Sequence, residues 1–174
     1  MNTEIATALD PGQPVAKAAI DLALHDLVCK KLGINLQTWL GSKAEDGVEL
    51  SYLVSVPDPE KATEVTEKAL TEGYKAFKVK VGHNPDVDVA NVKAVMDAAP
   101  GCVVWPDANQ GYSLSQALSM ARAFEDLGIE VFEQPIPMTD VSGRRKLLQR
   151  TSLSYVVDEP AHGHPHVSHL LPRE

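Results

Sequence analysis

Cysteines, aromatic residues and long apolar runs are all scarce in this 174-residue sequence. Its two cysteines, Cys29 and Cys102, stand far apart and in no metal-ligand spacing, so we expect free thiols rather than a disulfide framework or a zinc site. No stretch approaches the roughly 18 consecutive apolar residues that a membrane-spanning helix needs. The first ten residues have neither a basic start nor an apolar core, so they do not resemble a signal peptide. These absences indicate a cytoplasmic protein without a membrane partner.

Positive charge is also in short supply. Lysine and arginine total 16 against 24 aspartates and glutamates, which gives a formal net charge of −8. The basic run Arg144-Arg145-Lys146 is typical of one solvated helical turn. Because a nucleic-acid-binding surface needs clustered cations to replace phosphate counterions, we expect no nucleic-acid partner.

Short apolar segments alternate with amphipathic ones along most of the chain. The expected strands are Val48–Val56, Ala76–Val81, Cys102–Trp105, Ile129–Phe132 and Tyr155–Val157. The expected helices are Val15–Leu32, Pro59–Glu72, Asp86–Ala98, Ser113–Leu127 and a weaker Asp140–Arg150 that Gly143 interrupts. Alternation of this kind predicts an α/β fold with a parallel sheet, either as a barrel or as an open sheet, preceded by one helix.

Four charged residues, each at the end of an expected strand, follow one another at nearly constant spacing. Lys80 and Asp107 are 27 residues apart, Asp107 and Glu133 are 26 apart, and Glu133 and Asp158 are 25 apart. The carboxyl ends of parallel strands meet at one rim of the sheet, where binding and catalytic residues collect. We therefore expect these four side chains to form one site.

The three acids of this set suggest a metal site. Three carboxylates with open positions suit an octahedral Mg²⁺, and without a cation they would repel one another. Helix N-caps are the alternative, which explains any one acid more easily than three in register. Asn109 lies two residues beyond Asp107 and could share its face as a substrate contact, although the segment is also a good turn sequence.

The segment Phe77-Lys78-Val79-Lys80-Val81 places two lysines on one face of a strand, because side chains alternate along it. Two neighbouring ammonium groups lower each other's pKa, which would prepare one of them as a general base. Edge lysines that prevent strand pairing are the alternative without a function. A lysine that forms a Schiff base with a carbonyl substrate is a second chemical alternative.

These motifs resemble the ordered signature of the enolase superfamily, in its muconate-lactonizing and mandelate-racemase-like branch. The matching segments, within residues 14–160, are Lys78-Val79-Lys80-Val81-Gly82, Asp107-Ala108-Asn109-Gln110-Gly111, Glu133-Gln134-Pro135 and Asp158-Glu159. The resemblance implies a (β/α) barrel of the TIM type, here a partial one of about five parallel strands with helices outside. It also implies the following roles: Lys80 as the base, Lys78 as its neighbour, Asn109 near the substrate, and Asp107, Glu133 and Asp158 as Mg²⁺ ligands, with Glu159 competing for the last position.

The activity that this resemblance implies is Mg²⁺-dependent removal of a proton α to a carboxylate, through an enediolate. Depending on the fate of that intermediate, the enzyme would be a racemase or epimerase, a cycloisomerase or a dehydratase acting on a small carboxylate. An inactive half-barrel that binds Mg²⁺ or associates with partners is the alternative outside enzymology.

The sequence departs from the family in extent, because a closed barrel needs roughly 200 residues or more. We expect an incomplete barrel over residues 14–160, without the capping domain or the later strands and the opposite-face lysine that one of them carries. Residues 1–13 would be disordered or a remnant of the cap, and residues 161–174 a His-rich unstructured tail. Open strand edges predict self-association as a homo-oligomer.

Overall fold

The computed structural model describes residues 13–41 and 48–159, and the chain divides into two compact units, Met1–Val48 and Glu49–Glu174. The first unit contains helix α2 (Pro14–Leu32), as the sequence predicts, and a short helix α3 (Leu36–Trp39) that it does not predict. Helix α2 has proline in its first turn and ends at Gly33, whose left-handed φ of 68° is one that glycine adopts readily.

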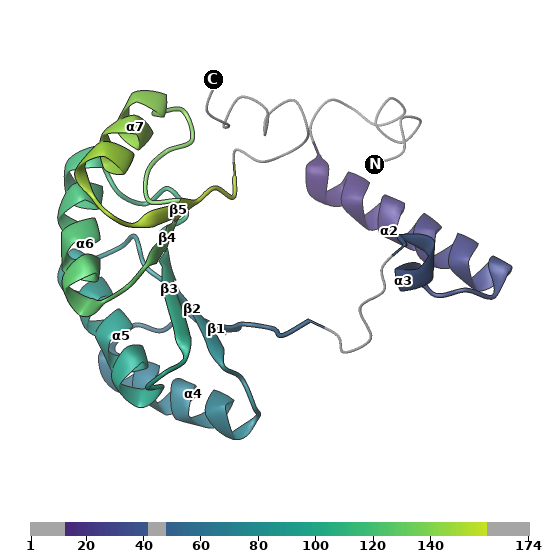
Figure 1. Cartoon of the computed structure of the whole chain (residues 1–174), viewed down its shortest axis with the longest axis horizontal. Helices are drawn as coiled ribbons and strands as arrows, with labels where there is room; N and C mark the ends of the chain where they lie inside the picture. The colour runs from purple at the N-terminus through teal and green to yellow at the C-terminus, as the bar shows by residue number, and fades with distance from the viewer. Residues whose placement is uncertain (1–12, 42–47, 160–174) are drawn as a thin grey trace. The chain divides into compact units, whose positions relative to one another are not determined.

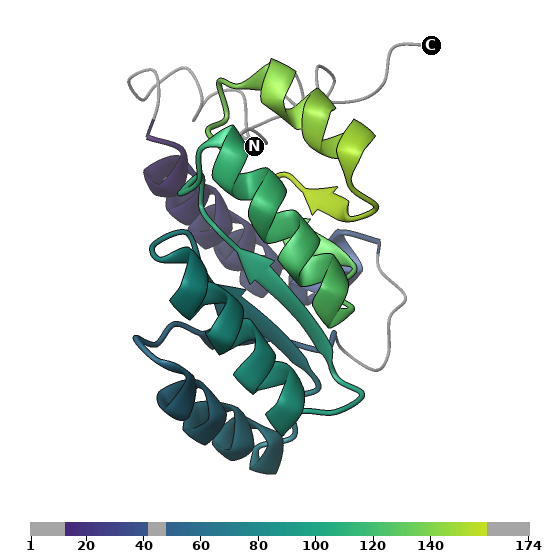
Figure 2. The ribbon, with the colours of Figure 1, turned by 90° about the vertical axis from the view of Figure 1, so that its left-hand side faces the viewer.

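The second unit is a parallel sheet covered by helices. Its strands are β1 (Tyr52–Val54), β2 (Ala76–Lys80), β3 (Val103–Asp107), β4 (Val131–Glu133) and β5 (Ser154–Val156), hydrogen-bonded in the order β1-β2-β3-β4-β5. Its helices are α4 (Pro59–Thr71), α5 (Pro85–Ala98), α6 (Leu114–Leu127) and α7 (Val141–Arg150). The helices lie in a row along one face of the sheet (Figures 1 and 2). The predicted α/β fold with five parallel strands is confirmed.

Helix starts follow the capping signals in the sequence. The Asp58 side chain caps α4 by accepting a hydrogen bond from the Lys61 backbone N–H at 2.8 Å. Ser113 and Gln116 form a reciprocal capping box at the start of α6. These caps fix where each helix begins after its strand, and so fix the loops at the carboxyl ends of β1 and β3.

The core lies between the sheet and helices α4–α7. Strand β2 sends Phe77 and Val79 into it, both at most 1% exposed, and directs Lys78 and Lys80 to the opposite face. On β4, the Phe132 ring packs edge-to-face on Phe124 of α6 with ring centroids 5.1 Å apart. The predicted alternation along β2 is therefore confirmed, and it separates a packed face from a face that carries charge.

The structure bears on the expected free thiols and on the expected lack of a membrane-spanning helix. Cys29 and Cys102 are both free. None of the described helices combines the length and the apolar character needed to cross a bilayer. The expectations for residues 1–12 and 160–174, including the His-rich tail, fall outside the described residues and stay predictions.

Helix α7 runs through Gly143 without interruption. The glycine is buried, and its backbone N–H donates to the capping carboxylate of Asp140 at 2.8 Å. A Cβ atom at this position would lie 2.3 Å from Asp140 Oδ2 and 2.8 Å from Ile136 Cδ1. Gly143 is thus required by the close approach of the cap, which explains a residue that weakened the sequence-based prediction of this helix.

We therefore expect Gly143→Ala to destabilise the protein, although the same change in an exposed helix interior stabilises by about 1 kcal/mol. The added methyl group displaces the Asp140 cap and clashes with buried Ile136, which together cost about 2–3 kcal/mol, so the net fall in the free energy of unfolding is about 1–2 kcal/mol. Urea unfolding of the variant measures this. Gln149→Ala, an exposed position on the same helix, is the control and should change the unfolding free energy by at most about 0.5 kcal/mol. A more stable Gly143→Ala protein would contradict the clash.

Candidate active site

Strands β2, β3 and β4 bring four charged side chains together on the face of the sheet opposite the core. Lys80 pairs in register with Asp107, which in turn pairs with Glu133. Lys80 Nζ lies 2.7 Å from Asp107 Oδ2, while Lys78 Nζ lies 2.9 Å from the same oxygen and 2.7 Å from Glu133 Oε1. The structure thus joins two lysines and two acids of the expected site in one ion-pair cluster.

Asp107 is the centre of this cluster, with a side chain that is 0% exposed. Its Oδ2 contacts both lysines, and its Oδ1 accepts a hydrogen bond from the Asn109 backbone N–H at 3.0 Å. Burial alone would raise the pKa of this carboxyl, but the hydrogen bonds from Lys80, Lys78 and Asn109 hold the pKa below its ordinary value. The counter-charge that the clustered acids require is supplied here by lysine.

Lys78 corrects one expectation from the sequence. Partial burial lowers the pKa of its ammonium group, yet the hydrogen bonds and charges of Glu133 and Asp107 outweigh burial and raise the pKa above its ordinary value. The expected net lowering of the pKa is therefore not found at Lys78, because Glu133 and Asp107 contact this lysine directly.

The Asn109 side chain connects Lys80, at the end of β2, with Glu159, which follows β5. Its Oδ1 accepts a hydrogen bond from the Lys80 ammonium, and its Nδ2 donates to Glu159 Oε1 at 3.2 Å. Asn109 and Gln110 both have left-handed backbones, with φ of 42° and 69°. Such conformations are uncommon for residues other than glycine and collect at functional loops. The exposed Asn109 side chain therefore lies beside Lys80 at the carboxyl end of the sheet.

Asp158 differs from Asp107 and Glu133 in that it is exposed. It follows β5, and its backbone N–H donates to the Gln134 side chain at 3.2 Å. Across residues 13–41 and 48–159, no three histidine, cysteine, aspartate or glutamate side chains are grouped so that they could hold a metal ion. The three acids expected as ligands are therefore not assembled as one set in this arrangement.

The donor chemistry at this rim nevertheless fits a hard divalent cation. Asp107 and Glu133 offer carboxylate oxygens from adjacent strands, which are the donors that Mg²⁺ prefers. Glu159 Oε2 is buried and has no hydrogen-bond partner among the described residues, so a cation there would satisfy it. This observation brings Glu159 forward beside Asp158 as a candidate ligand.

Two residues of this region were missed by the sequence reasoning. The Trp105 indole N–H donates to Glu133 Oε2 at 2.9 Å. Because Trp105 lies two residues before Asp107 on the same strand, alternation alone could have identified it. Gln134 is 2% exposed, has a left-handed φ of 36° and donates from its side-chain amide to the Ile136 carbonyl at 2.9 Å. No sequence pattern signals that conformation.

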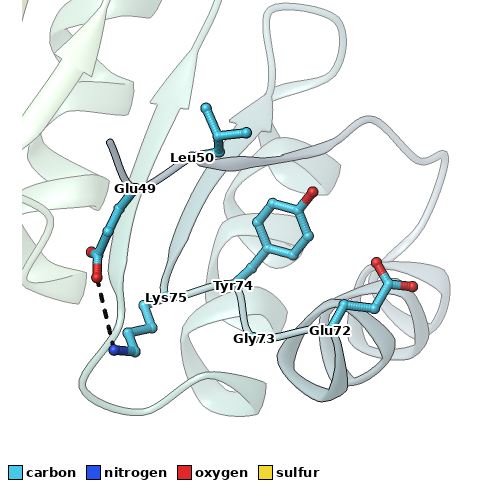
Figure 3. A pocket seen from close by; sticks show the side chains of 6 residues that line it. All are labelled: Glu49, Leu50, Glu72, Gly73, Tyr74 and Lys75. Atoms are coloured by element: carbon cyan, nitrogen blue, oxygen red, sulfur yellow. Dashed lines mark ion pairs between the residues drawn. The ribbon is translucent and has the colours of Figure 1, made fainter. Parts of the chain in front are cut away.

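A shallow pocket of about 260 Å³ lies elsewhere on this unit (Figure 3). It is lined by Glu49, Leu50, Glu72, Gly73, Tyr74 and Lys75. Lys75 and Glu49 form an ion pair at 3.8 Å. Lys75 precedes β2, so the pocket lies near the start of the strand, about 16 Å of extended chain before Lys80. It is therefore separate from the charged cluster.

Comparison with known proteins gives consistent matches. A family model described as enolase C-terminal domain-like matches residues 61–174. The N-succinyl-L-Arg/Lys racemase of Bacillus cereus is 32% identical over 150 residues, which cover 85% of this chain and 41% of that protein.

Two solved structures have the same fold. A mandelate racemase/muconate lactonizing family protein from Azoarcus sp. EbN1 superposes with a TM-score of 0.86 at 29% identity, covering 97% of this chain and 47% of that one. The dipeptide epimerase of Cytophaga hutchinsonii, solved with Mg and the dipeptide D-Ala-L-Val, gives 0.77 at 27% identity, covering 85% and 40%. The chain thus spans less than half the length of these proteins, as expected for a partial barrel.

The ion-pair cluster should make stability depend on Asp107 in a pH-dependent way. Asp107→Asn leaves two lysines facing one carboxylate fewer, so we expect the free energy of unfolding at pH 7 to fall by about 3 kcal/mol. Because the folded-state pKa of Asp107 lies below its unfolded value near 3.8, its stabilisation is complete above that value and is lost as pH falls through the folded-state pKa. The gap between variant and wild type should therefore shrink below about pH 4.

Urea unfolding at a series of pH values between neutral and acid measures this gap. Asp126→Asn, an exposed acid on α6, is the matched control and should shift the unfolding free energy by no more than about 0.5 kcal/mol. A gap for Asp107→Asn that stays constant into acid would show that the ion pairs do not stabilise the fold.

Proposed function

This chain belongs to the enolase C-terminal domain-like family, and from that premise we propose that it carries the proton-abstracting half of a Mg²⁺-dependent racemase or epimerase site. The observation that supports this most directly is the position of Lys80, whose Nζ contacts Asp107 and Asn109 at the carboxyl end of the sheet. A base candidate, hard-oxygen donors and a polar side chain there share one rim, which is where parallel α/β folds place their chemistry.

In this proposal the Lys80 amine, in its neutral form, takes the α-proton of a bound carboxylate onto Nζ. Lys78 holds Asp107 and Glu133 in place, and the Asn109 amide orients the substrate next to Lys80. Asp107, Glu133 and Asp158 would hold Mg²⁺, with Glu159 as the competitor for the last position. A bound ion would supply positive charge that stabilises the negative charge developing on the substrate carboxylate.

The substrate class we propose is an N-acylated amino acid or a dipeptide. The relatives named above are a racemase of N-succinylated amino acids and a dipeptide epimerase, and both kinds of substrate carry an α-proton next to a carboxylate. Racemisation also needs a group on the opposite face of that carbon. With Lys80 alone, the expected half-reaction is exchange of the α-proton with solvent. We also expect the protein to be cytoplasmic and to bind no nucleic acid.

A Schiff-base lyase fits the same lysines less well. A lysine nucleophile must be a neutral amine, and the raised pKa of Lys78 keeps this side chain protonated. Lys80 contacts Asp107 and Asn109 and must be neutral in either reaction, so this lysine does not separate the two, and the family match is what favours proton abstraction.

A half-barrel that associates through its sheet is a second candidate, favoured by apolar exposure. Leu53, Val103 and Val156 are 53%, 62% and 42% exposed. In the strand registers they lie on the same face as Lys78 and Glu133 rather than on the helix-covered face. Burying these side chains against a second copy of this chain would remove apolar surface from water.

We expect Lys80→Ala to abolish α-proton exchange, measured by NMR in D₂O with N-succinyl amino acids and dipeptides in the presence and absence of Mg²⁺. Loss of a general base lowers the rate by about 100-fold or more. Lys75→Ala is the matched control, because it removes a lysine whose side chain is 74% exposed. This variant should catalyse α-proton exchange at the wild-type rate. Exchange that depends on neither the metal nor Lys80 would remove the proposed mechanism.

The association candidate is tested by light scattering during size-exclusion chromatography over a range of concentrations. Dimers that dissociate when Leu53→Lys places a second positive charge opposite Lys78 on the exposed sheet face would support it, because an unpaired buried charge is strongly unfavourable. A wild-type monomer at every concentration would contradict it. Arg145→Ala, on the exposed side of α7, is the control and should leave the mass unchanged.

A further inference from the structure

A buried acid outside the charged cluster gathers the loop that follows β2. Asp88 on α5 is 4% exposed, and its Oδ2 accepts hydrogen bonds from the backbone N–H groups of Gly82, His83 and Asn84 at 3.0, 3.1 and 3.1 Å. The same oxygen accepts the hydroxyl of Tyr112 at 2.6 Å. Four donors on one carboxylate oxygen fix the path of this loop, since hydrogen bonds to a charged group are stronger than those between neutral groups.

Tyr112 joins this loop to two others. Its hydroxyl oxygen accepts the Gly82 N–H at 3.0 Å, and its backbone N–H donates to the Pro135 carbonyl at 3.1 Å. Its ring lies against Phe132 of β4 with centroids 6.3 Å apart. The tyrosine is 2% exposed, and burial beside Asp88 raises its pKa, so the hydroxyl keeps its proton and remains a donor.

Two glycines bring the loops into backbone contact. Gly82 has a φ of 103°, and a Cβ atom on it would lie 2.6 Å from the Ala108 carbonyl oxygen. A Cβ atom on Gly111 would lie 2.5 Å from the Gly82 carbonyl oxygen. Neither loop can shift toward the other, and the hydrogen bonds of Asp88 and Tyr112 prevent separation.

Each loop begins at a residue of the proposed site. Gly82 lies two residues after Lys80, Gly111 two residues after Asn109, and Pro135 two residues after Glu133. We infer that Asp88 and Tyr112 are positioning residues that hold Lys80, Asn109 and Glu133 in one fixed arrangement by clamping the three loops that follow them. The chemical purpose of that arrangement rests on the proposed function, but the clamp itself does not.

Tyr112→Phe tests the clamp, because it removes one hydroxyl and leaves the ring in place. The readouts are the ¹³Cε signal of Lys80 and the side-chain amide signal of Asn109 in the full chain, together with hydrogen exchange at the Gly82 amide. Tyr155→Phe is the matched control, since it removes a part-buried hydroxyl that bonds to Thr151 at 2.7 Å.

In Tyr112→Phe we expect the Lys80 and Asn109 signals to shift and exchange at Gly82 to accelerate about tenfold, the change for losing one net hydrogen bond. In Tyr155→Phe the same signals should stay at their wild-type positions. A Tyr112→Phe protein that loses stability but keeps the Lys80 and Asn109 signals unchanged would reduce the hydroxyl to a purely structural role and overturn the inference.

Asp88→Asn provides a second variant, because the amide keeps an acceptor oxygen of the same size but loses the charge that strengthens all four hydrogen bonds. The Lys80 and Asn109 signals should then move as well, and unchanged signals would again overturn the clamp. None of these measurements needs substrate or Mg²⁺. A wild-type chain that fails to exchange α-protons would therefore refute the proposed function while the spectra still decide the role of Asp88 and Tyr112.

Discussion

The buried carboxylate of Asp107 is the constraint around which the charged rim is organised. An ionised carboxylate that is fully removed from water is strongly destabilising unless it is paired and hydrogen-bonded. Two lysines from the neighbouring strand and one backbone N–H meet that requirement for Asp107, and Glu133 shares Lys78. Two acids thus face two ammonium groups. The cluster orders four long side chains that would otherwise be free to rotate, which is the condition a catalytic arrangement needs.

The parallel sheet explains why this cluster can exist beside a dry core. Alternation along β2 sends Phe77 and Val79 toward the helices and the two lysines to the other face, so apolar packing and charge do not compete for the same space. The strand register then brings the charged side chains together, because Lys80, Asp107 and Glu133 occupy matching positions on three adjacent strands. The same register brings the loops after these strands together, where Asn109 and Gln134 adopt left-handed backbones.

The parts of this structure that repeat with a regular period could be predicted from sequence. Strands, helices, the two faces of β2 and the alignment of Lys80 with Asp107 all follow from spacing and alternation. The pKa direction of Lys78 could not, because it depends on which charge lies nearest, and Glu133 lies on another strand. Asp88 could not be predicted either, since it is one of two acids in the first turn of α5 and nothing in the sequence shows that it is the one buried against a distant tyrosine hydroxyl.

The separation between residues that contact the site and residues that clamp its loops follows from the geometry of parallel strands. The position of a side chain at a strand end depends on the loop that begins two residues later as well as on its own strand, and loops are less constrained than strands. Direct backbone contact between Gly82 and Gly111, closed by the Tyr112 hydroxyl, makes the loops after β2 and β3 move as one body. Fixing loops to one another positions Lys80 relative to Asn109 without adding any group to the space that a substrate would need.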